Sequence, residues 1–171
     1  MMLTISRKKV VIRNFTSEVV RGYLPQWGFV NQTHCELLDL SGKAQAVQLN
    51  GIKTISYVKD FNMADATDPE RIGRRRFTGR PRNEGLWLRL FFMDKDVLEG
   101  LVRFDMGFVD GLLEDRGLAL MPPDGRSNTY RVFVPRSALN HVEVLGFIGS
   151  AVQRKGLQAA NTSLQGGLFG E

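Results

Sequence analysis

Apolar and polar residues alternate in short runs along most of the chain. In the first third of the sequence these runs occupy residues 9–12, 18–24, 33–40, 44–49 and 52–58. An alternation with a period of two, rich in β-branched and aromatic residues, is typical of β-strands with one buried face. Polar or glycine-containing breaks separate the runs, so we expect neighbouring strands to be joined by short turns.

The same alternation returns in the second half of the chain, over residues 86–92, 97–104, 118–121, 130–134 and 139–145. In the first of these runs apolar side chains fall on both faces, because Trp87 and Phe91 alternate with Leu88, Leu90 and Phe92. A strand that is apolar on both faces needs cover on both faces. We therefore expect this strand to be central in a sheet or to be covered on its outer side.

The two sets of strands are similar in sequence. Residues 10–23 align with residues 88–101 without a gap, which places Gly22 on Gly100. Residues 46–58 then align with residues 130–145. An internal repeat indicates a duplicated structural unit, so the sequence predicts an all-β protein made of two related β units.

Between and after the two units the alternation stops. Asp, Asn, Gly, Pro and Arg dominate residues 61–85, and glycine and polar residues dominate the end of the chain. The predicted organisation is therefore a first unit over residues 1–60, a linker over 61–85, a second unit over 86–149 and a flexible tail over 150–171. A long linker inside a compact protein is uncommon, so we expect it to wrap over a unit or to carry function.

The hairpin over residues 88–104 carries Gly100 five positions before Asp105, and a strand, a tight break and another strand follow over residues 132–139. This order of elements resembles the two sequence motifs of the Sm-like and Hfq family. The resemblance implies two Sm-like small barrels in tandem. It does not extend to the uridine pocket of that family, because Met106, Gly107 and Phe108 follow the aspartate where an asparagine would be expected.

The chain also resembles a duplicated bacterial domain of uncharacterised function. The matching positions are a hairpin over residues 96–100 and a later segment that comprises Pro122, Asp124, Ser127, Asn128, Arg131, Phe133 and Val134. This resemblance covers both units but neither the linker nor the tail, and it implies no specific activity.

Positive charge is concentrated in the linker. The chain has a formal net charge of +5, and six of its arginines lie within twelve residues: Arg71, Arg74, Arg75, Arg76, Arg80 and Arg82. Guanidinium groups bind phosphates, and Phe77 inside the cluster could stack on a base. These residues predict a site for RNA or single-stranded nucleic acid.

Three other interpretations stay open, two for these arginines and one for the end of the chain. The arginines could instead pair with acids of the second unit, namely Asp94, Asp96, Glu99, Glu114 and Asp115, in a protein-interaction or self-assembly scaffold. Arg76 and Arg80 also resemble the arginine motif with which PilZ domains hold cyclic di-GMP, although the second PilZ motif is absent. Residues 165–169 resemble a peptide that docks on the bacterial sliding clamp, with Leu168 and Phe169 as anchors.

Signals for catalysis and for cofactors are weak. Cys35 is the only cysteine, and its neighbour His34 points to the opposite face of the same strand, so the two cannot form a nucleophile and base pair. The second histidine, His141, lies far away, which makes a metal site improbable. We expect a non-enzymatic cytoplasmic protein without a cofactor or membrane span. We also expect it to form a homo-oligomer if Trp87 and Phe91 point outward together.

Overall fold

The computed structural model describes residues 6–25, 29–31, 33–104 and 116–150. Apart from one turn of 3-10 helix at Arg136–Ala138, the regular structure in these residues consists of strands, which confirms the predicted all-β class. The strands are β1 (Arg7–Asn14), β2 (Val19–Pro25), β3 (Val30–Asn31), β4 (His34–Leu38), β5 (Ala44–Gln48), β6 (Ile52–Val58), β7 (Gly85–Phe92), β8 (Val97–Val102), β9 (Gly117–Leu120), β10 (Thr129–Pro135) and β11 (Leu139–Ile148).

Every alternating run of the sequence contributes to a strand. Among the described strands, β3 is the one that no alternating run predicts, because its two residues are too few to show a period. The predicted tail lies outside the described residues except for Ser150, and so do Trp27 and the segment around Asp105.

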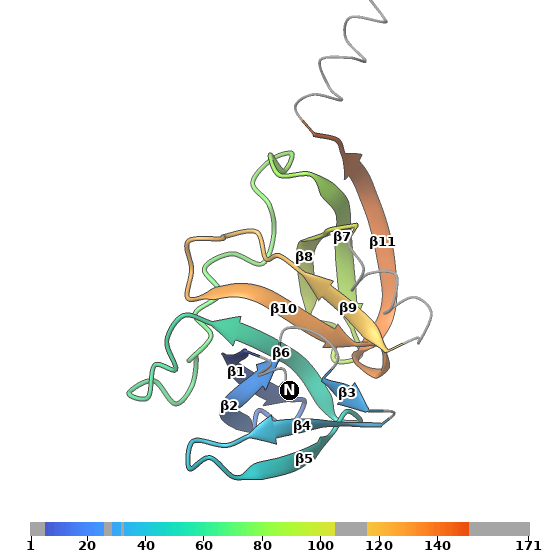
Figure 1. The fold of residues 1–171 in the computed structure, drawn as a ribbon. Coiled ribbons are helices and arrows are strands. Elements are labelled where there is room, and N and C mark those ends of the chain that lie inside the picture. Colours follow the sequence, from blue (N-terminus) through green and yellow to red (C-terminus); the bar gives the residue numbers. More distant parts are fainter. Residues whose placement is uncertain (1–5, 26–28, 32, 105–115, 151–171) are drawn as a thin grey trace, which may run out of the picture.

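The strands form two open sheets. The larger sheet has the order β3-β4-β2-β1-β6-β10-β9, with β5 on the other edge of β4, and the smaller one has the order β11-β7-β8 (Figure 1). A bridge between Leu101 in β8 and Met121 after β9 links the two sheets. No closed barrel is seen in the described parts of the chain, so the two tandem Sm-like barrels predicted from the sequence are not confirmed.

Strand β10 joins the halves of the chain. It pairs with β6 on one side and with β9 on the other. Its alternating side chains serve two separate hydrophobic cores: Phe133 packs among residues of β1, β4 and β6, whereas Val132 and Val134 pack among residues of β7 and β8. The two halves therefore share a strand that each needs to complete its core.

Two glycines allow close contacts between strands. A Cβ atom at Gly22 in β2 would lie 2.6 Å from Leu37 Cδ1 and from the carbonyl oxygen of Leu38. A Cβ atom at Gly100 in β8 would lie 2.3 Å from Leu120 Cδ1. We call Gly22 and Gly100 the strand glycines, because the lack of a side chain at each lets neighbouring strands approach closely.

The linker has no strand, but hydrogen bonds fix it to both halves of the chain. Glu70 is buried, and its carboxylate accepts hydrogen bonds from Arg13 Nε and Nη2 of β1 at 2.7 and 2.6 Å. The Glu70 carbonyl accepts a hydrogen bond from Thr129 Oγ1 of β10 at 2.7 Å. In Figure 1 the linker, drawn in green, follows one side of the molecule from the end of β6 to the start of β7.

Candidate functional site

The arginine-rich part of the linker forms one wall of a cleft of about 410 Å³. Its lining residues are Arg74, Arg76, Phe77, Thr78, Gly79, Arg80, Pro81, Arg82 and Asn83 of the linker, with Leu101 of β8 and Pro123 of the turn before β10. The structure therefore brings four of the six predicted arginines, and Phe77, to one site.

Backbone hydrogen bonds hold this wall against the edge of β8. The Glu99 amide donates to the carbonyl oxygen of Arg75 at 2.8 Å. The Phe77 amide donates to Glu99 Oε2 at 2.9 Å. One glutamate of β8 thus fixes the linker backbone on both sides of Arg76, so hydrogen bonds within the chain define the shape of this wall.

Glu99 is almost fully buried and has further partners. Arg89 of β7 donates from Nη2 and Nε to Glu99 Oε1 at 2.8 and 3.1 Å, and Trp87 Nε1 lies 3.4 Å from Oε2. Burial alone would raise the pKa of the Glu99 carboxyl, but the hydrogen bonds from Phe77, Arg89 and Trp87 outweigh it. The pKa of Glu99 is therefore lowered, and the group stays ionised.

The aromatic residues of the site contact one another. The Phe77 ring lies edge-on to the Trp87 ring, with 6.0 Å between centroids and 81° between planes. Phe91 stacks on His141 at 4.1 Å. Trp87 and Phe91 thus have partners within the chain and are half-buried, and an oligomer interface at these residues stays a prediction.

The arginines differ in what their side chains contact. Arg75 pairs with Asp96 at 2.9 Å, and Arg71, which does not line the cleft, lies 3.6 Å from Asp65. Arg80 Nη2 donates to the carbonyl oxygen of Phe147 at 3.3 Å. Within the described residues, the side chains of Arg74 and Arg76 form no hydrogen bond or ion pair.

The interpretation in which the arginines pair with acids therefore applies to Arg75 and Asp96. Glu99 pairs with Arg89 rather than with the linker arginines, and Asp94 pairs with Lys53. Glu114 and Asp115 lie outside the described residues.

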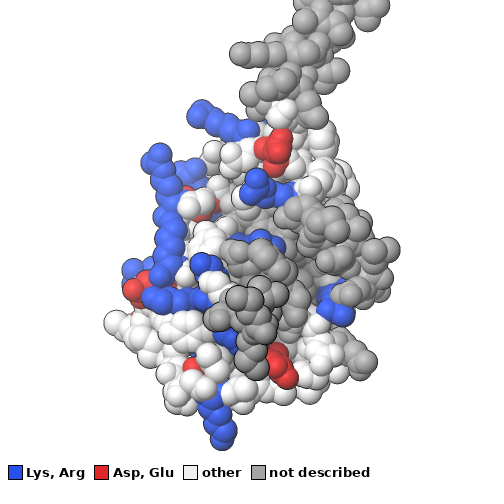
Figure 2. Space-filling model, viewed as in Figure 1, with Lys and Arg blue, Asp and Glu red and all other residues white. Residues whose placement is uncertain are grey.

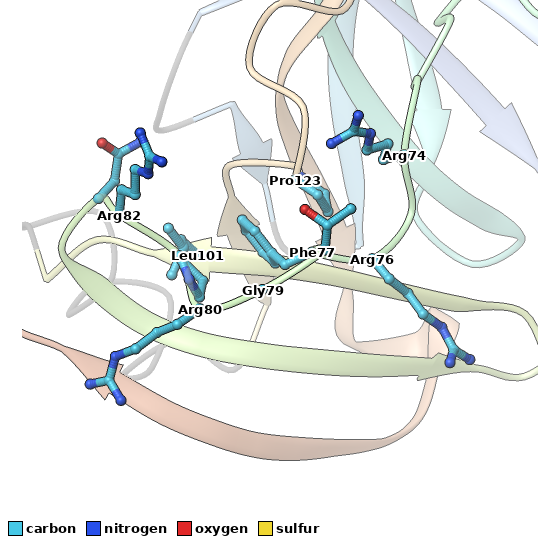
Figure 3. A pocket seen from close by; sticks show the side chains of 11 residues that line it. Arg74, Arg76, Phe77, Gly79, Arg80, Arg82, Leu101 and Pro123 are labelled. Atoms are coloured by element: carbon cyan, nitrogen blue, oxygen red, sulfur yellow. The ribbon is translucent and has the colours of Figure 1, made fainter.

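The charged groups of the cleft are spread out. Figure 3 shows Arg74, Arg76, Arg80 and Arg82 pointing in different directions around Phe77 and Leu101. In the orientation of Figure 1, Lys and Arg side chains gather along the side of the molecule that the linker follows (Figure 2). Such an arrangement suits several separate negative charges better than a single small anion.

The family of the chain follows from a match along almost its whole described length. A family model matches residues 6–146, which include all of the linker and most of β11. The chain belongs to DUF6982, a family of unknown function. The expectation of an uncharacterised domain is thereby confirmed. No curated protein and no solved structure matches this DUF6982 chain.

Among the described residues of the DUF6982 chain, Asp94 and Asp96 are paired with a cation and Cys35 is buried. Asp94 and Asp96 both accept hydrogen bonds from Lys53, at 2.7 and 2.8 Å, and Arg75 also pairs with Asp96, so two cations balance the two carboxylates. Cys35 is fully buried, and burial raises the pKa of its thiol to about 11. Among the described residues no group of His, Cys, Asp or Glu could hold a metal ion, and no helix there is long and apolar enough to cross a membrane.

Two residues that matter for the site escaped the sequence analysis. Glu70 lies in a polar stretch of the linker, and Lys53 lies between the buried residues Ile52 and Thr54 of β6. Neither has a sequence signal beyond its charge. For Glu99 a signal existed, because the predicted hairpin places it opposite Arg89, as the pairing of β7 and β8 shows.

Proposed function

We propose that this DUF6982 chain is a non-enzymatic module that binds RNA or single-stranded nucleic acid through the arginine-lined cleft. The observation that carries the proposal is the composition of the cleft: four guanidinium groups surround Phe77 and Leu101. Arg74 and Arg76 among them have no partner in the described residues, so their charges are available to phosphates.

The fixed backbone of the linker supports this proposal. A binding loop that is ordered before its ligand arrives loses less conformational entropy on binding. The hydrogen bonds of Glu99 to the backbone of Arg75 and Phe77 provide that order. A freely moving arginine-rich segment would lack this advantage.

The apolar surfaces near the cleft favour a single strand over a duplex. Phe104 and Phe147 are each more than half exposed, at 56% and 55%, and their rings lie 5.7 Å apart. The hydrogen bond from Arg80 to the Phe147 carbonyl places this pair beside the cleft. Unpaired bases stack on exposed aromatic rings, whereas the bases of a duplex are already stacked on each other.

The proposal includes an architecture of two related, Sm-like units. In the first unit, β1 pairs with β2 and β6, and Gly22 lies opposite Val10. In the second, β7 pairs with β8 and β11, and Gly100 lies opposite Leu88. In both units the first strand pairs with the corresponding two strands, and the strand glycine lies opposite the corresponding residue. These similarities support descent from one duplicated unit.

The deciding experiment is a titration of a mixed-sequence single-stranded RNA by fluorescence anisotropy at low and moderate salt. The variant Arg74→Ala/Arg76→Ala/Arg80→Ala removes three charges from the cleft. We expect its affinity to fall by about tenfold or more. The slope of log K against log salt should become less negative by about 2, because each lost phosphate contact of a single strand contributes roughly 0.7.

The matched control is Arg7→Ala/Lys8→Ala/Lys43→Ala, which removes the same charge from exposed positions that do not line the cleft. This control should keep most of the affinity. Absence of binding by the wild type, or equal losses in both variants, would contradict the proposal. Circular dichroism of each variant checks that the fold is retained.

A second candidate ligand is cyclic di-GMP, because Arg76 and Arg80 line the same cleft. The same proteins can be tested for it by thermal unfolding. A rise in the melting temperature with cyclic di-GMP that Arg76→Ala/Arg80→Ala abolishes would favour nucleotide sensing over RNA binding.

A further inference from the structure

We infer that copies of this chain associate head to tail, with the free edge of β11 in one copy pairing with the free edge of β5 in the next. In the described residues β5 pairs only with β4, and β11 pairs only with β7. The two edges lie at opposite ends of the molecule (Figure 1). Unpaired backbone groups on an edge strand form a template for another strand.

The burial of equivalent residues indicates that β11 lacks a neighbour. Tyr57 of β6 pairs with Val10 of β1, and Val144 of β11 pairs with Leu88 of β7. Because Val10 and Leu88 both lie opposite a strand glycine, Tyr57 and Val144 occupy the same position in their units. Tyr57 is fully buried, but Val144 is 65% exposed.

The next inward-facing position repeats this contrast. Ile55 of β6 is fully buried, whereas its counterpart Val142 of β11 is 38% exposed. Beside Ile55 lies the adjacent strand β10, whose Phe133 pairs with it and belongs to the same core. The second unit has the same apolar edge, and no described strand covers it.

The structure also identifies which strand would supply the cover. Leu37 lies against one strand glycine and Leu120 against the other. Leu37 pairs with Gln45 of β5, and Leu120 pairs with Val132 of β10. The two strands β5 and β10 therefore occupy the same place in their units, and β5 is the strand whose outer edge is open.

The internal join of β10 to β6 then predicts the register between copies. Phe133 and Ile55 face each other in that join. Gln45 of β5 corresponds to Val132 of β10, so the next residue, Ala46, corresponds to Phe133. Val142 of β11 corresponds to Ile55 of β6. We thus expect Ala46 of one copy to lie opposite Val142 of the next. This contact joins two different surfaces, so the copy at each end of the assembly keeps one open edge until the assembly closes into a ring.

The side chains of the two edges are compatible with such a contact. On β5, Ala44, Ala46 and Gln48 are exposed, small or uncharged, and no lysine or proline protects this edge. Val142 and Val144 supply the apolar side chains on β11. Edges that must stay free usually carry charges or prolines that prevent pairing.

A test of this inference measures the mass of the full chain by sedimentation velocity over a range of concentrations. The wild type should form dimers or larger species as the concentration rises. Val144→Lys places a charge on the edge of β11 and should weaken association by about tenfold or more. Met63→Lys is the control, because Met63 is 64% exposed in the linker, and it should associate like the wild type.

Cysteine cross-linking tests the register. The single variants Ala46→Cys and Val142→Cys, mixed and oxidised, should give a disulfide-linked dimer that contains one chain of each. Ala46→Cys mixed with Glu143→Cys should not, because Glu143 points to the other face of β11. The native Cys35 is buried and does not interfere.

Either of two results would overturn the inference: a wild type that stays monomeric at every concentration, or association that Val144→Lys leaves unchanged. Nucleic-acid binding is measured separately with the cleft variants. Failure of self-association therefore leaves the proposed function standing, and the reverse also holds.

Discussion

Glu99 links the cleft to the interior of the second unit. Its carboxylate accepts hydrogen bonds from the linker backbone at Phe77 and from Arg89 and Trp87 of β7. A buried carboxylate with several donors is stabilised in its charged form, and loss of that charge leaves the donors unsatisfied. One residue thus maintains both local stability and the shape of the site.

The change Glu99→Gln should lower the free energy of unfolding by about 1–3 kcal/mol near neutral pH, because a neutral amide replaces the buried carboxylate that accepts hydrogen bonds from Phe77, Trp87 and Arg89. Chemical denaturation measures this loss. Glu143→Gln is the control: Glu143 also lies near Arg89, at 3.5 Å, but is 47% exposed. We expect the control to lose less than about 0.5 kcal/mol. Equal losses in the two variants would contradict the role of Glu99.

The pH dependence of this difference follows from the lowered pKa of Glu99. The folded state binds this proton less tightly than the unfolded state does. The stabilisation is therefore complete above the ordinary glutamate pKa and is lost as the pH falls through the lower pKa of the folded state. The gap in unfolding free energy between the wild type and Glu99→Gln should shrink in that acidic range and stay constant above it.

At the scale of elements, the strand glycines determine how closely neighbouring strands approach. A Cβ atom at Gly22 would clash with the backbone oxygen of Leu38, which cannot move without separating β2 from β4. The same alternation that predicts strands also makes such a glycine conspicuous, because it interrupts a run of larger residues.

The change Gly22→Ala should therefore cost about 1–3 kcal/mol of stability through overpacking. Gly125→Ala is a suitable comparison, because a Cβ atom at Gly125 meets no atom within 4 Å. Thermal unfolding of both variants measures the difference. A melting temperature of Gly22→Ala as high as that of Gly125→Ala would show that the strands separate at no cost.

Strand positions could be predicted from the sequence because a period of two is a local property. The pairing of β6 with β10 could not, because the backbone hydrogen bonds that join distant strands leave no mark on side-chain periodicity. The arginines of the cleft were visible as a cluster. That Arg75 is neutralised by Asp96 while Arg74 and Arg76 are not depends on how the linker lies against β8, which only the folded chain determines.

At the scale of the whole molecule, β10 makes the two halves interdependent. Phe133 completes the core of the first half from a strand of the second. Neither half buries its apolar residues fully alone, so we expect the wild type to unfold in one cooperative transition.

The change Phe133→Ala removes that shared contact and should cost about 3–5 kcal/mol. It should also lower the melting temperature or split the transition in two. Calorimetry measures both effects. Phe147→Ala serves as the control, because Phe147 is 55% exposed and contributes little to either core. A single unshifted transition in Phe133→Ala would contradict the coupling.

The hydrogen bonds between the linker and β8 affect how readily a protease can cleave the chain. Six arginines in a segment without strands would ordinarily be the first place where a trypsin-like protease cuts. A protease must pull several residues into an extended shape, and here the Arg75 carbonyl and the Phe77 amide are already engaged. Cleavage therefore has to wait for local unfolding, and the segment that carries the charge of the cleft is protected for as long as Glu99 holds it.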